Sequence, residues 1–243
     1  MLSGRASWDD VRAALVDEAD FLREWLASER VQTNEVRRCW WLLPCFLEVA
    51  RRRSIAAFDC VELGCSGGLN LLWDRYGYDY ANGSFSGAPT FAGEERTAVP
   101  VSPLPPVRSR IGVDAAPPDL STDDGVRYLT SFVWVGQEQR LADLDAAVTV
   151  WRRDPPDIVV GDILDELPGL LRRGPNLVWS TAALDYMPRE RRQAVRDLIA
   201  ESGVAYVETG RPLDGSHDYY GLFVDGDEVA HAEFHGVWVD WLA

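Results

Sequence analysis

The sequence predicts an α/β fold, in which an open, mostly parallel sheet has helices on its faces and ends in an antiparallel C-terminal hairpin. Two observations predict it. From residue 58 onward, short apolar runs alternate with stretches of helical period, as in a parallel sheet flanked by helices. The first run also leads into a glycine-rich segment, 64–68, as at a turn between a strand and a helix. We therefore expect an N-terminal helical extension over 1–57 and an α/β domain over 58–243.

The N-terminal region has helical patterns on both sides of a polar stretch. Ser7 is suited to cap a first helix that runs to Leu26. A second, apolar helix is expected over 39–53, where Pro44 would kink it. Between them, residues 32–35 read Gln-Thr-Asn-Glu, a composition that suits the cap of the following helix as well as a polar site.

The α/β region shows five strands in chain order, over 58–63, 110–113, 157–160, 176–180 and 204–208. Helices are expected over 137–151, over 164–171 and from Pro188 onward. An antiparallel hairpin, 219–224 with 229–235, is expected around the Asp-Gly turn at 225–226. Residues 77–108 are rich in Pro, Gly and Ser and are too long for an ordinary connection, so we expect an insertion there, either a lid or a hairpin.

The glycine-rich turn after the first strand predicts a binding site. Glycines let the chain turn tightly and let a ligand approach main-chain N–H groups. The start of the following helix adds unpaired donors and a partial positive charge. The motif therefore favours an anionic group, although a tight turn without a ligand has the same residue types. The candidate binding residues are Glu62, Gly64, Ser66, Gly67, Gly68 and Asn70.

Polar residues also follow the other expected strands. In an open parallel sheet, ligands bind beyond the carboxyl ends of the strands. Asp114 follows the second strand, Asp162 the third, and Ser180 and Thr181 end the fourth. Asp114 is suited to accept hydrogen bonds from a diol and Asp162 from an amino group, but each aspartate is equally suited to cap a helix.

The composition limits the partners and the location. The formal net charge is −15, which repels phosphate backbones and anionic lipids, so we expect no nucleic-acid or membrane binding. A cationic substrate or a basic protein remains compatible. No apolar run approaches the roughly 18 residues of a membrane span, and the first residues lack the apolar core of a signal peptide. We therefore expect a cytoplasmic protein.

Thiols and imidazoles give no metal site in this interpretation. Cys39, Cys45, Cys60 and Cys65 form no CxxC pair, so we expect reduced core thiols. Cys65, in the glycine-rich turn, is either a packing residue or a nucleophile with a lowered pKa. His231 and His235 would share one strand face, but no third ligand accompanies them, so no metal is expected.

Four segments carry a resemblance to known families: Val-Gln-Thr-Asn-Glu-Val at 31–36, the segment 62–76, the pattern of Trp134, Gln137, Arg140 and Leu141, and Gly161-Asp162. Over most of residues 20–210 the chain resembles the DUF2332 family and, more widely, the Rossmann-like fold of class I S-adenosylmethionine (SAM) methyltransferases. That resemblance implies SAM as cofactor, with its carboxylate at the glycine turn, its ribose on Asp114 and its adenine near Asp162.

Two features depart from these families. The usual methyltransferase turn is GxGxG, and here Ser66 replaces the central glycine; a GCSSG-type turn followed by Asn occurs in some plant carboxyl methyltransferases. Family members usually carry a further helical region before the 32–35 segment. The resemblance therefore implies a separate small helical partner protein, which would also cover the apolar face from Leu15 to Trp25.

Three functions are compatible with these features. In the first, the chain transfers a methyl group from SAM to a small molecule, enclosed by the 77–108 insertion. Alignment supplies much of the catalysis of such an in-line displacement. Glu35 and His217 are the candidate bases, although His217 also suits a solvated loop. The candidate catalytic residues are Asn34, Glu35, Ser180, Thr181, Tyr186 and His217.

The second function uses no cofactor. An internal amine would displace a sulfate held at the glycine turn and close an aziridine ring, a reaction of the azinomycin-type pathways of secondary metabolism, whose enzymes the chain resembles. Arg75 or Arg140 would assist sulfate departure. In the third, the chain is a non-catalytic scaffold, and its sign would be a glycine corner blocked by side chains.

Overall fold

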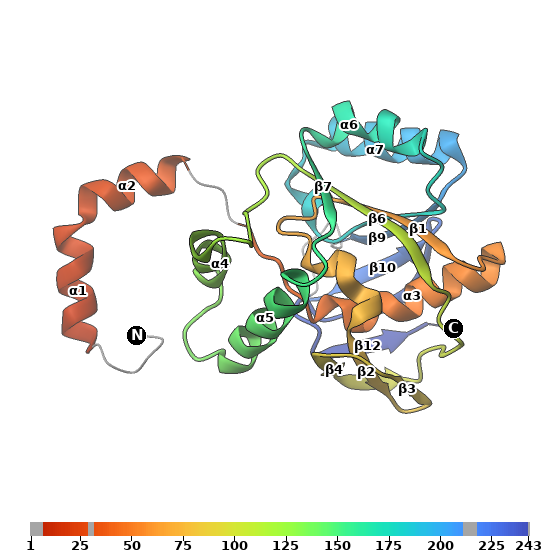
Figure 1. Ribbon diagram of the computed structural model, residues 1–243, viewed down its shortest axis with the longest axis horizontal. Helices are drawn as coiled ribbons and strands as arrows, with labels where there is room; N and C mark the ends of the chain where they lie inside the picture. Colours follow the sequence, from red (N-terminus) through yellow and green to blue (C-terminus); the bar gives the residue numbers. More distant parts are fainter. Residues whose placement is uncertain (1–6, 29–31, 211–217, 243) are drawn as a thin grey trace.

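The computed structural model describes residues 7–28, 32–210 and 218–242. Within these residues, a nine-stranded sheet has the order β5-β12-β11-β10-β9-β8-β1-β6-β7 (Figure 1). The strands are β1 (Phe58–Leu63), β5 (Glu94–Thr97), β6 (Val107–Asp114), β7 (Asp157–Val160), β8 (Leu177–Ser180), β9 (Ala205–Gly210), β10 (Tyr220–Val224), β11 (Asp227–Ala232) and β12 (Trp238–Trp241). The predicted Rossmann-like α/β sheet is confirmed.

The direction of the strand order reverses at β1. This strand pairs in parallel with β6 on one side and with β8 on the other, so that Leu63 lies opposite Val113 and Glu62 opposite Trp179. β7 and β9 extend the parallel sheet outward. The antiparallel hairpin of β10 and β11 is present as predicted. The edge pair of β12 with β5 was not predicted, because β5 belongs to the insertion.

Helices cover both faces of this sheet and give each face its own core. On one face lie α3 (Arg38–Arg53), α5 (Glu138–Trp151) and the 3-10 helix η1 (Leu69–Arg75), and on the other lie α6 (Ile163–Leu171) and α7 (Arg189–Ser202) (Figure 1). The centre of the Phe46 ring of α3 lies 4.9 Å from the ring centre of Trp73 and 5.1 Å from that of Trp179. The turn after β1 is thus supported by an aromatic core on one face of the sheet.

α3 belongs to the α/β domain. Every residue from Cys39 to Val49 is buried, and these residues form one core with the sheet. The expected extension over 1–57 therefore contains a helix that is packed inside the domain. A helix that is apolar all round is stable only when it is covered on all sides, which is why the boundary at residue 57 does not separate two packed units.

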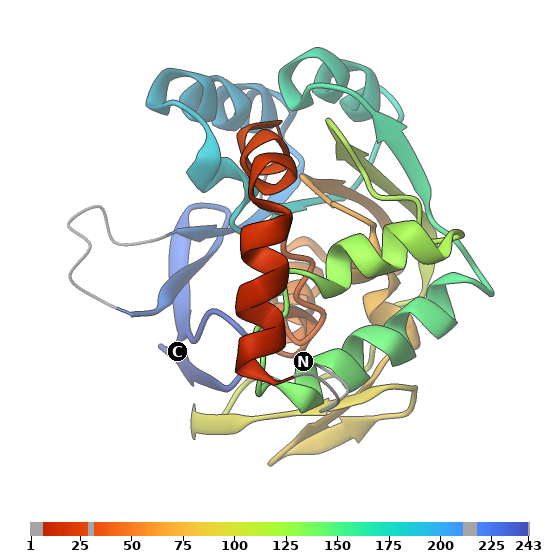
Figure 2. The ribbon, with the colours of Figure 1, turned by 90° about the vertical axis from the view of Figure 1, so that its left-hand side faces the viewer.

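The part that stands apart from the body is α1 (Trp8–Asp17) with α2 (Ala19–Ser28) (Figure 1). In the view of Figure 2 these two helices lie in front of the rest of the chain. Ser7 caps α1 as predicted, in a reciprocal capping box with Asp10. The single predicted helix is divided at Glu18. α1 has no buried residue, and the Trp25 ring of α2 lies 6.4 Å from the Tyr128 ring. Within the described ranges, the model has no helix whose length and apolar character would suit a membrane crossing.

The insertion forms a small second sheet. Its strands β2 (Gly77–Tyr80), β3 (Gly83–Phe85) and β4 (Thr90–Ala92) have the order β3-β2-β4. The β2–β3 pair is the predicted hairpin. The Trp40 indole N–H donates to Asp79 O at 3.1 Å, and Tyr80 OH donates to Trp40 O at 2.5 Å. The insertion is therefore attached to α3, and this attachment argues against a lid.

Candidate functional site

The candidate site lies at the carboxyl ends of β1 and β8, because the strand order reverses between β1 and its neighbours there. In open α/β sheets such a switch point is where ligands bind. The turn 64–68 follows β1, Asp114 ends β6, and Ser180 ends β8. The structure thus brings together the glycine turn and two of the predicted strand-end residues.

The N–H groups of the glycine turn are mostly used within the chain. Of the six donors from 64 to 69, five have acceptors, and the Gly67 N–H has none among the described residues. Val113 O accepts the N–H groups of Gly64 at 2.8 Å and Cys65 at 3.2 Å, and Cys65 O accepts that of Gly68 at 2.8 Å. Side chains accept the other two: Asp114 Oδ2 binds the Ser66 N–H at 2.8 Å, and Asn34 Oδ1 binds the Leu69 N–H at 3.2 Å. The expectation of a row of free amides is therefore wrong.

The helix after the turn is also different from the prediction. η1 is a 3-10 helix in which Leu72 has non-helical backbone angles (φ −92°, ψ 17°). A short 3-10 segment has poorer hydrogen-bond geometry than an α-helix. The expected α-helix N-terminus, with its aligned dipole, is absent from this described segment, and so that part of the argument for an anion at the turn does not hold.

The packing of the fold itself accounts for the glycines. A Cβ on Gly64, whose φ is +71°, would lie 2.1 Å from Ala183 Cβ. A Cβ on Gly67 would lie 2.8 Å from Leu120 Cδ1. Gly68 also has a left-handed backbone, with φ +76°. Glycine adopts a positive φ without steric cost, which accounts for Gly64 and Gly68, although Ser66 also has a positive φ of 51°. The contact with Leu120 accounts for Gly67, so packing explains the three glycines without any ligand.

Asp114 is held beside the turn, as predicted. Its carboxylate accepts the Ser66 N–H at 2.8 Å and the Ala116 N–H at 3.0 Å, and Gln32 Nε2 lies 3.5 Å from Oδ1. The side chain is half-buried. Residue 32 therefore covers one side of the same corner, and Asp114 is positioned by both the turn and the N-terminal segment.

Asp162 caps a helix, which is the alternative to ligand binding that its sequence position allowed. It is the N-cap of α6, where its side chain accepts the Leu164 N–H at 2.9 Å. Both of its oxygens also lie 2.6 Å from Arg191 Nη2 of α7. The carboxylate thus caps a helix and pairs with a guanidinium, while its side chain remains 43% exposed.

The remaining predicted catalytic residues do not converge. Ser180 is buried and donates to Leu63 O at 3.1 Å, so its hydroxyl ties β8 to β1. Thr181 is buried beside it, whereas the Tyr186 side chain is 77% exposed. His217 lies outside the described residues. Ser180 and Thr181 therefore remain at the switch point, and Tyr186 faces solvent.

Among the described residues, several buried polar atoms at the switch point have no partner with good hydrogen-bond geometry. They are Glu62 Oε2, Ser66 Oγ, Trp179 Nε1 and Gln32 Oε1. Burial raises the pKa of Glu62 well above its ordinary value, although the nearby Trp179 indole, as a hydrogen-bond donor, and the charge of Arg38 act in the opposite direction. Asn70 is buried nearby, and its Oδ1 accepts only a long contact, 3.5 Å, from Cys39 Sγ. Unsatisfied buried polar atoms are costly, and each of them requires a structural or functional explanation.

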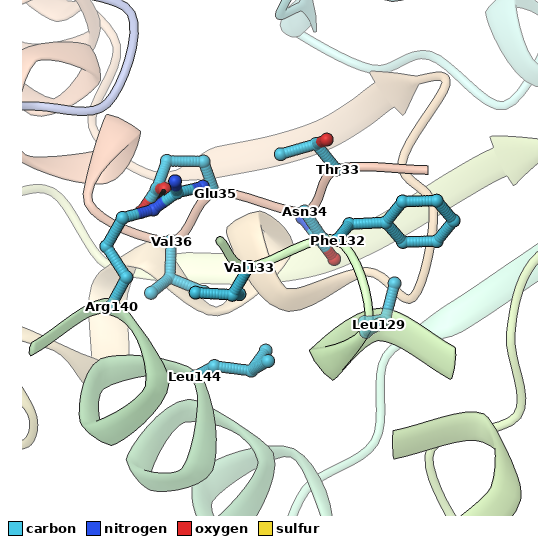
Figure 3. Close-up of a pocket in the computed structure, with 9 residues that line it drawn as sticks. All are labelled: Thr33, Asn34, Glu35, Val36, Leu129, Phe132, Val133, Arg140 and Leu144. Atoms are coloured by element: carbon cyan, nitrogen blue, oxygen red, sulfur yellow. Dashed lines mark hydrogen bonds and ion pairs between the residues drawn. The ribbon is translucent and has the colours of Figure 1, made fainter. Parts of the chain in front are cut away.

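Glu35 forms a second polar group next to this corner. Its Oε2 lies 2.5 Å from Arg140 Nε and 3.6 Å from His235 Nδ1. Burial opposes ionisation, but His235, Arg140 and Arg38 hold the pKa of Glu35 below its ordinary value. Figure 3 shows Glu35 and Arg140 at one end of a small pocket, with Asn34 at its wall. Its cavity is about 10 Å³, which is room for about one water.

Two residues of this region were missed by sequence reasoning. His235 follows β11 and Arg38 begins α3, and both approach Glu35 only through the fold. Neither residue stands in a motif, since 200 positions separate Glu35 from His235. Arg38 lies just after the polar segment 32–35 in the sequence and shows no feature of a site there. Among the described residues, no group of three or more His, Cys, Asp and Glu side chains is arranged to hold a metal ion.

Cys65 has the packing role. Its side chain is 1% exposed, and burial raises the pKa of its thiol well above the ordinary value. A Cβ on Gly112 would lie 2.4 Å from Cys65 Sγ. The thiol thus fills space between β1 and β6, and a lowered-pKa nucleophile is not supported.

Comparison with known proteins gives a family and a weak structural likeness. The family model described as "uncharacterized protein conserved in bacteria (DUF2332)" matches residues 3–241. None of the curated proteins compared with the chain matches it. Two solved structures are similar at 12% identity. Magnesium protoporphyrin IX methyltransferase from Synechocystis PCC 6803, with bound SAM, has a TM-score of 0.33 over 86% of this chain and 79% of its own. A putative SAM-dependent methyltransferase from Methanococcus maripaludis has a TM-score of 0.32, and the match covers 80% of this chain and 63% of the methyltransferase.

Proposed function

The chain belongs to the DUF2332 family, and from the switch-point geometry we propose that it is an enzyme that modifies a small molecule by nucleophilic displacement at carbon. One observation carries this proposal: in the part of the chain that the structure describes, the polar atoms Glu62 Oε2 and Ser66 Oγ are buried at the carboxyl end of β1 without well-aligned partners. A stable protein seldom leaves such atoms unsatisfied. A bound ligand that supplies their hydrogen bonds accounts for them.

Methyl transfer is the first candidate reaction. SAM, when bound, supplies an electrophilic methyl group. Glu62, Ser66 and Asn70 offer polar atoms for its amino-acid portion, and Asp114 lies beside the turn where a ribose would be held. Asp162 is not part of this set, because Arg191 and α6 engage its carboxylate. Polar residues are therefore available for the amino-acid portion and the ribose of SAM, but no residue is assigned to its adenine.

The N-terminal segment has to move for a ligand of this size to bind. Small-molecule sites have volumes of about 300 Å³ or more, whereas the pocket beside Asn34 is about 10 Å³. Asn34 and Gln32 lie over the turn from opposite sides through contacts of 3.0–3.5 Å. These few polar contacts are the part that a ligand would replace.

Glu35 and Asn34 are the proposed acceptor-side residues. Glu35 is ionised and held by Arg140, so it is suited to align a cationic or hydroxyl group of the acceptor. Alignment contributes much of the rate of an in-line displacement, and a base is needed only for a weakly acidic acceptor. Ser180 and Thr181 would form the floor at the end of β8.

Ring closure without SAM is the second candidate, because it needs a smaller ligand than methyl transfer does. The cavity of about 10 Å³ would still have to open for it, and the sulfate would need side-chain donors, since most amides of the turn are satisfied within the chain. In this reaction an internal amine would displace sulfate and close an aziridine, as in secondary metabolism. A non-catalytic scaffold is the third possibility, since Leu120 and Ala183 occupy the space beside Gly67 and Gly64.

Calorimetric titration separates the three. Binding of S-adenosylhomocysteine (SAH) with a dissociation constant of about 100 μM or tighter supports the methyl-transfer proposal, corresponding to about 5 kcal/mol or more. No heat with SAH, together with a sulfate-dependent rise in melting temperature, supports ring closure. The absence of both responses overturns the enzymatic proposal and leaves the scaffold.

A small helical partner protein is part of the proposal. Large apolar side chains of α1 and α2 are exposed, namely Trp8, Leu15, Val16, Phe21 and Leu26. An exposed apolar stripe of this kind is typical of an interaction surface. Co-expression with a small helical protein encoded beside this chain, followed by size-exclusion chromatography, tests it. A monodisperse, active monomer contradicts it.

A further inference from the structure

Two buried ionisable side chains differ from the rest because they take part in no ion pair. Five charged side chains of the described residues are buried: Glu35, Arg38, Glu48, Glu62 and Asp143. Glu35 pairs with Arg140, Glu48 with Arg51 and Arg52, and Asp143 with Arg37. Within the described part of the chain, Arg38 and Glu62 have no oppositely charged group within 4.0 Å. A buried charge without a partner is costly.

Arg38 is held in place by neutral groups. It is 6% exposed, its Nε donates to Phe234 O at 3.1 Å, and its guanidinium lies 5.6 Å from the centre of the Tyr220 ring. The other guanidinium N–H groups have no acceptor among the described residues. Because arginine donates through a planar fork, these contacts fix one side of the group and leave its other donors unused.

The neighbouring carboxylates form no close ion pair with this arginine, although its charge contributes to the lowered pKa of Glu35. Glu35 is already 2.5 Å from Arg140. Burial keeps Glu62 towards its protonated form, because it raises the pKa of that carboxyl well above the ordinary value. With Glu62 in its protonated form, Arg38 and Arg140 share one nearby carboxylate, Glu35, which is paired with Arg140. An anion bound beside Arg38 would supply the close counter-charge that this guanidinium lacks.

We propose that Arg38 binds an anionic oxygen group of the small-molecule substrate, a carboxylate or a sulfate. The inference rests on the proposed function only in taking the ligand to be the substrate. A guanidinium suits both groups, because its parallel N–H donors match two oxygens at once. The sequence suggested Arg75 or Arg140 as the arginine that assists sulfate departure. These two are paired with Asp154 and Glu35, so we assign the anion-binding role to Arg38 instead.

The position of Arg38 in the sheet separates this group from the cofactor residues. Its two contacts are to β10, through Tyr220, and to the segment after β11, through Phe234. Asp114 ends β6, which lies on the opposite side of β1 from β8, β9 and β10. The anionic group of the substrate would thus lie on the β10 side of the switch point, and a nucleoside on the β6 side.

Sulfate is the probe for the first experiment, because it is one of the two proposed groups. The melting temperature is measured in sodium sulfate and in sodium chloride of matched ionic strength, for the wild type, Arg38→Gln and Arg108→Gln. Arg108 is 63% exposed and pairs with Asp59, so its variant removes the same charge from the surface. Sulfate also stabilises proteins nonspecifically. The rise in melting temperature that sulfate still causes in Arg38→Gln measures this nonspecific stabilisation.

We expect a sulfate-specific stabilisation in the wild type and Arg108→Gln that is lost in Arg38→Gln, with an apparent affinity for sulfate that is at least about tenfold weaker. Equal stabilisation of all three proteins overturns the inference. If Arg38→Gln does not fold, a crystal of the wild type soaked in selenate decides: an anomalous peak within hydrogen-bond distance of Arg38 supports the inference, and its absence overturns it.

Two further titrations identify the anion and separate this inference from the cofactor. Acetate in place of sulfate tests the carboxylate, and whichever anion loses affinity in Arg38→Gln is the group that this residue recognises. SAH binding is measured on the same proteins. If SAH fails to bind while the Arg38-dependent sulfate effect is present, methyl transfer is overturned and the anion site is supported. If SAH binds and no anion effect depends on Arg38, methyl transfer is supported and the anion site at Arg38 is overturned.

Discussion

Asn34 Oδ1 accepts a hydrogen bond from the Leu69 N–H at 3.2 Å, which joins the polar N-terminal segment to the first residue of η1. Gln32 makes the equivalent contact on the other side of the turn, where its Nε2 donates to Ala116 O at 3.0 Å. The two side chains therefore tie the N-terminal segment to the first residue of η1 and to the residues that follow β6. A segment that suited either a helix cap or a polar site thus closes the glycine turn and lies in the proposed ligand path.

Asp114 and Asp162 provide the clearest test of the cofactor assignment, because the structure gives them different roles. We expect Asp114→Asn to weaken SAH binding by at least about tenfold, the value of roughly one charge-assisted hydrogen bond. Asp162→Asn is expected to leave SAH affinity unchanged, because its carboxylate serves α6 and Arg191. Isothermal titration of the two variants measures both.

Thermal melting provides the control for this pair. Asp162→Asn weakens a charged cap and an exposed ion pair, so we expect a loss of about 0.5–1 kcal/mol in the free energy of unfolding. If SAH binds equally well to the Asp114 variant and the wild type, the ribose assignment is wrong. If Asp162→Asn alone abolishes binding, the adenine prediction from sequence is restored in place of the helix cap.

The sheet could be predicted from the sequence because its signals are local. Each parallel strand is a short apolar run followed by a turn residue, and the predicted 58–63 and 157–160 agree with β1 and β7. α4 (Asp123–Thr130) was missed, since it is short and contains Gly125. The insertion could not be derived in detail, because its strand pairing depends on contacts with α3 that no local pattern records.

The glycine turn gives a second prediction, which follows from its packing. We expect Gly64→Ala to be more destabilising than Gly67→Ala. At Gly64 a Cβ meets Ala183 Cβ at 2.1 Å and the φ is +71°, whereas at Gly67 it meets only the Leu120 side chain at 2.8 Å. Overpacking alone costs about 1–3 kcal/mol, and the positive φ adds about 1 kcal/mol more for Gly64→Ala.

Urea denaturation of the two glycine variants measures the difference in the free energy of unfolding. The double variant Gly67→Ala/Leu120→Ala provides the control, because the smaller side chain makes room for the new methyl group. The penalty of Gly67→Ala measured in the Leu120→Ala background should then be smaller than in the wild type. A Gly67→Ala protein that is as stable as the wild type would mean that Leu120 does not fill this space.

The site was predicted in part, for reasons that Asp114 and Arg38 illustrate. Asp114 could be found because it ends a recognisable strand next to the one that carries the glycine turn. Arg38 and His235 could not, because their significance lies in burial and in proximity to Glu35, which arise from distant segments. The free amides were predicted wrongly since sequence shows the donors of a turn but not their acceptors, such as Asp114 for the Ser66 N–H.

Glu35 gives a third prediction, concerning stability. Glu35→Gln leaves Arg140, whose side chain is only 11% exposed, without its ion pair. Breaking a buried pair from one side costs about 3–5 kcal/mol. We expect the double variant Glu35→Gln/Arg140→Met to recover part of this loss, because it removes the stranded charge. Urea denaturation at neutral pH measures all three free energies of unfolding, with Asp9→Asn as an exposed control that costs at most about 1 kcal/mol.

The pH dependence of this variant has a defined sign. The pKa of Glu35 is lowered in the folded protein from the reference 4.5, so the wild type gains stability from its ionised form above pH 4.5 and loses it as the pH falls through the folded value. Glu35→Gln lacks this contribution. The stability gap between wild type and variant should therefore narrow on acidification; a constant gap contradicts the assignment of Glu35 as an ionised, paired carboxylate.

Glu62 gives the last prediction, and its sign is opposite. Burial raises the pKa of this carboxyl well above the reference 4.5, so the folded protein keeps its proton while the unfolded chain loses it. The resulting stability is complete below pH 4.5 and is lost as the pH rises through the folded pKa. We expect Glu62→Gln, which resembles the protonated form, to equal the wild type near pH 4.5 and to exceed it in stability as the pH rises. Urea denaturation from pH 4.5 to 8 measures this. A variant that becomes less stable than the wild type over that range would show that Glu62 is ionised beside Arg38, and the two buried charges would then neutralise each other without a ligand.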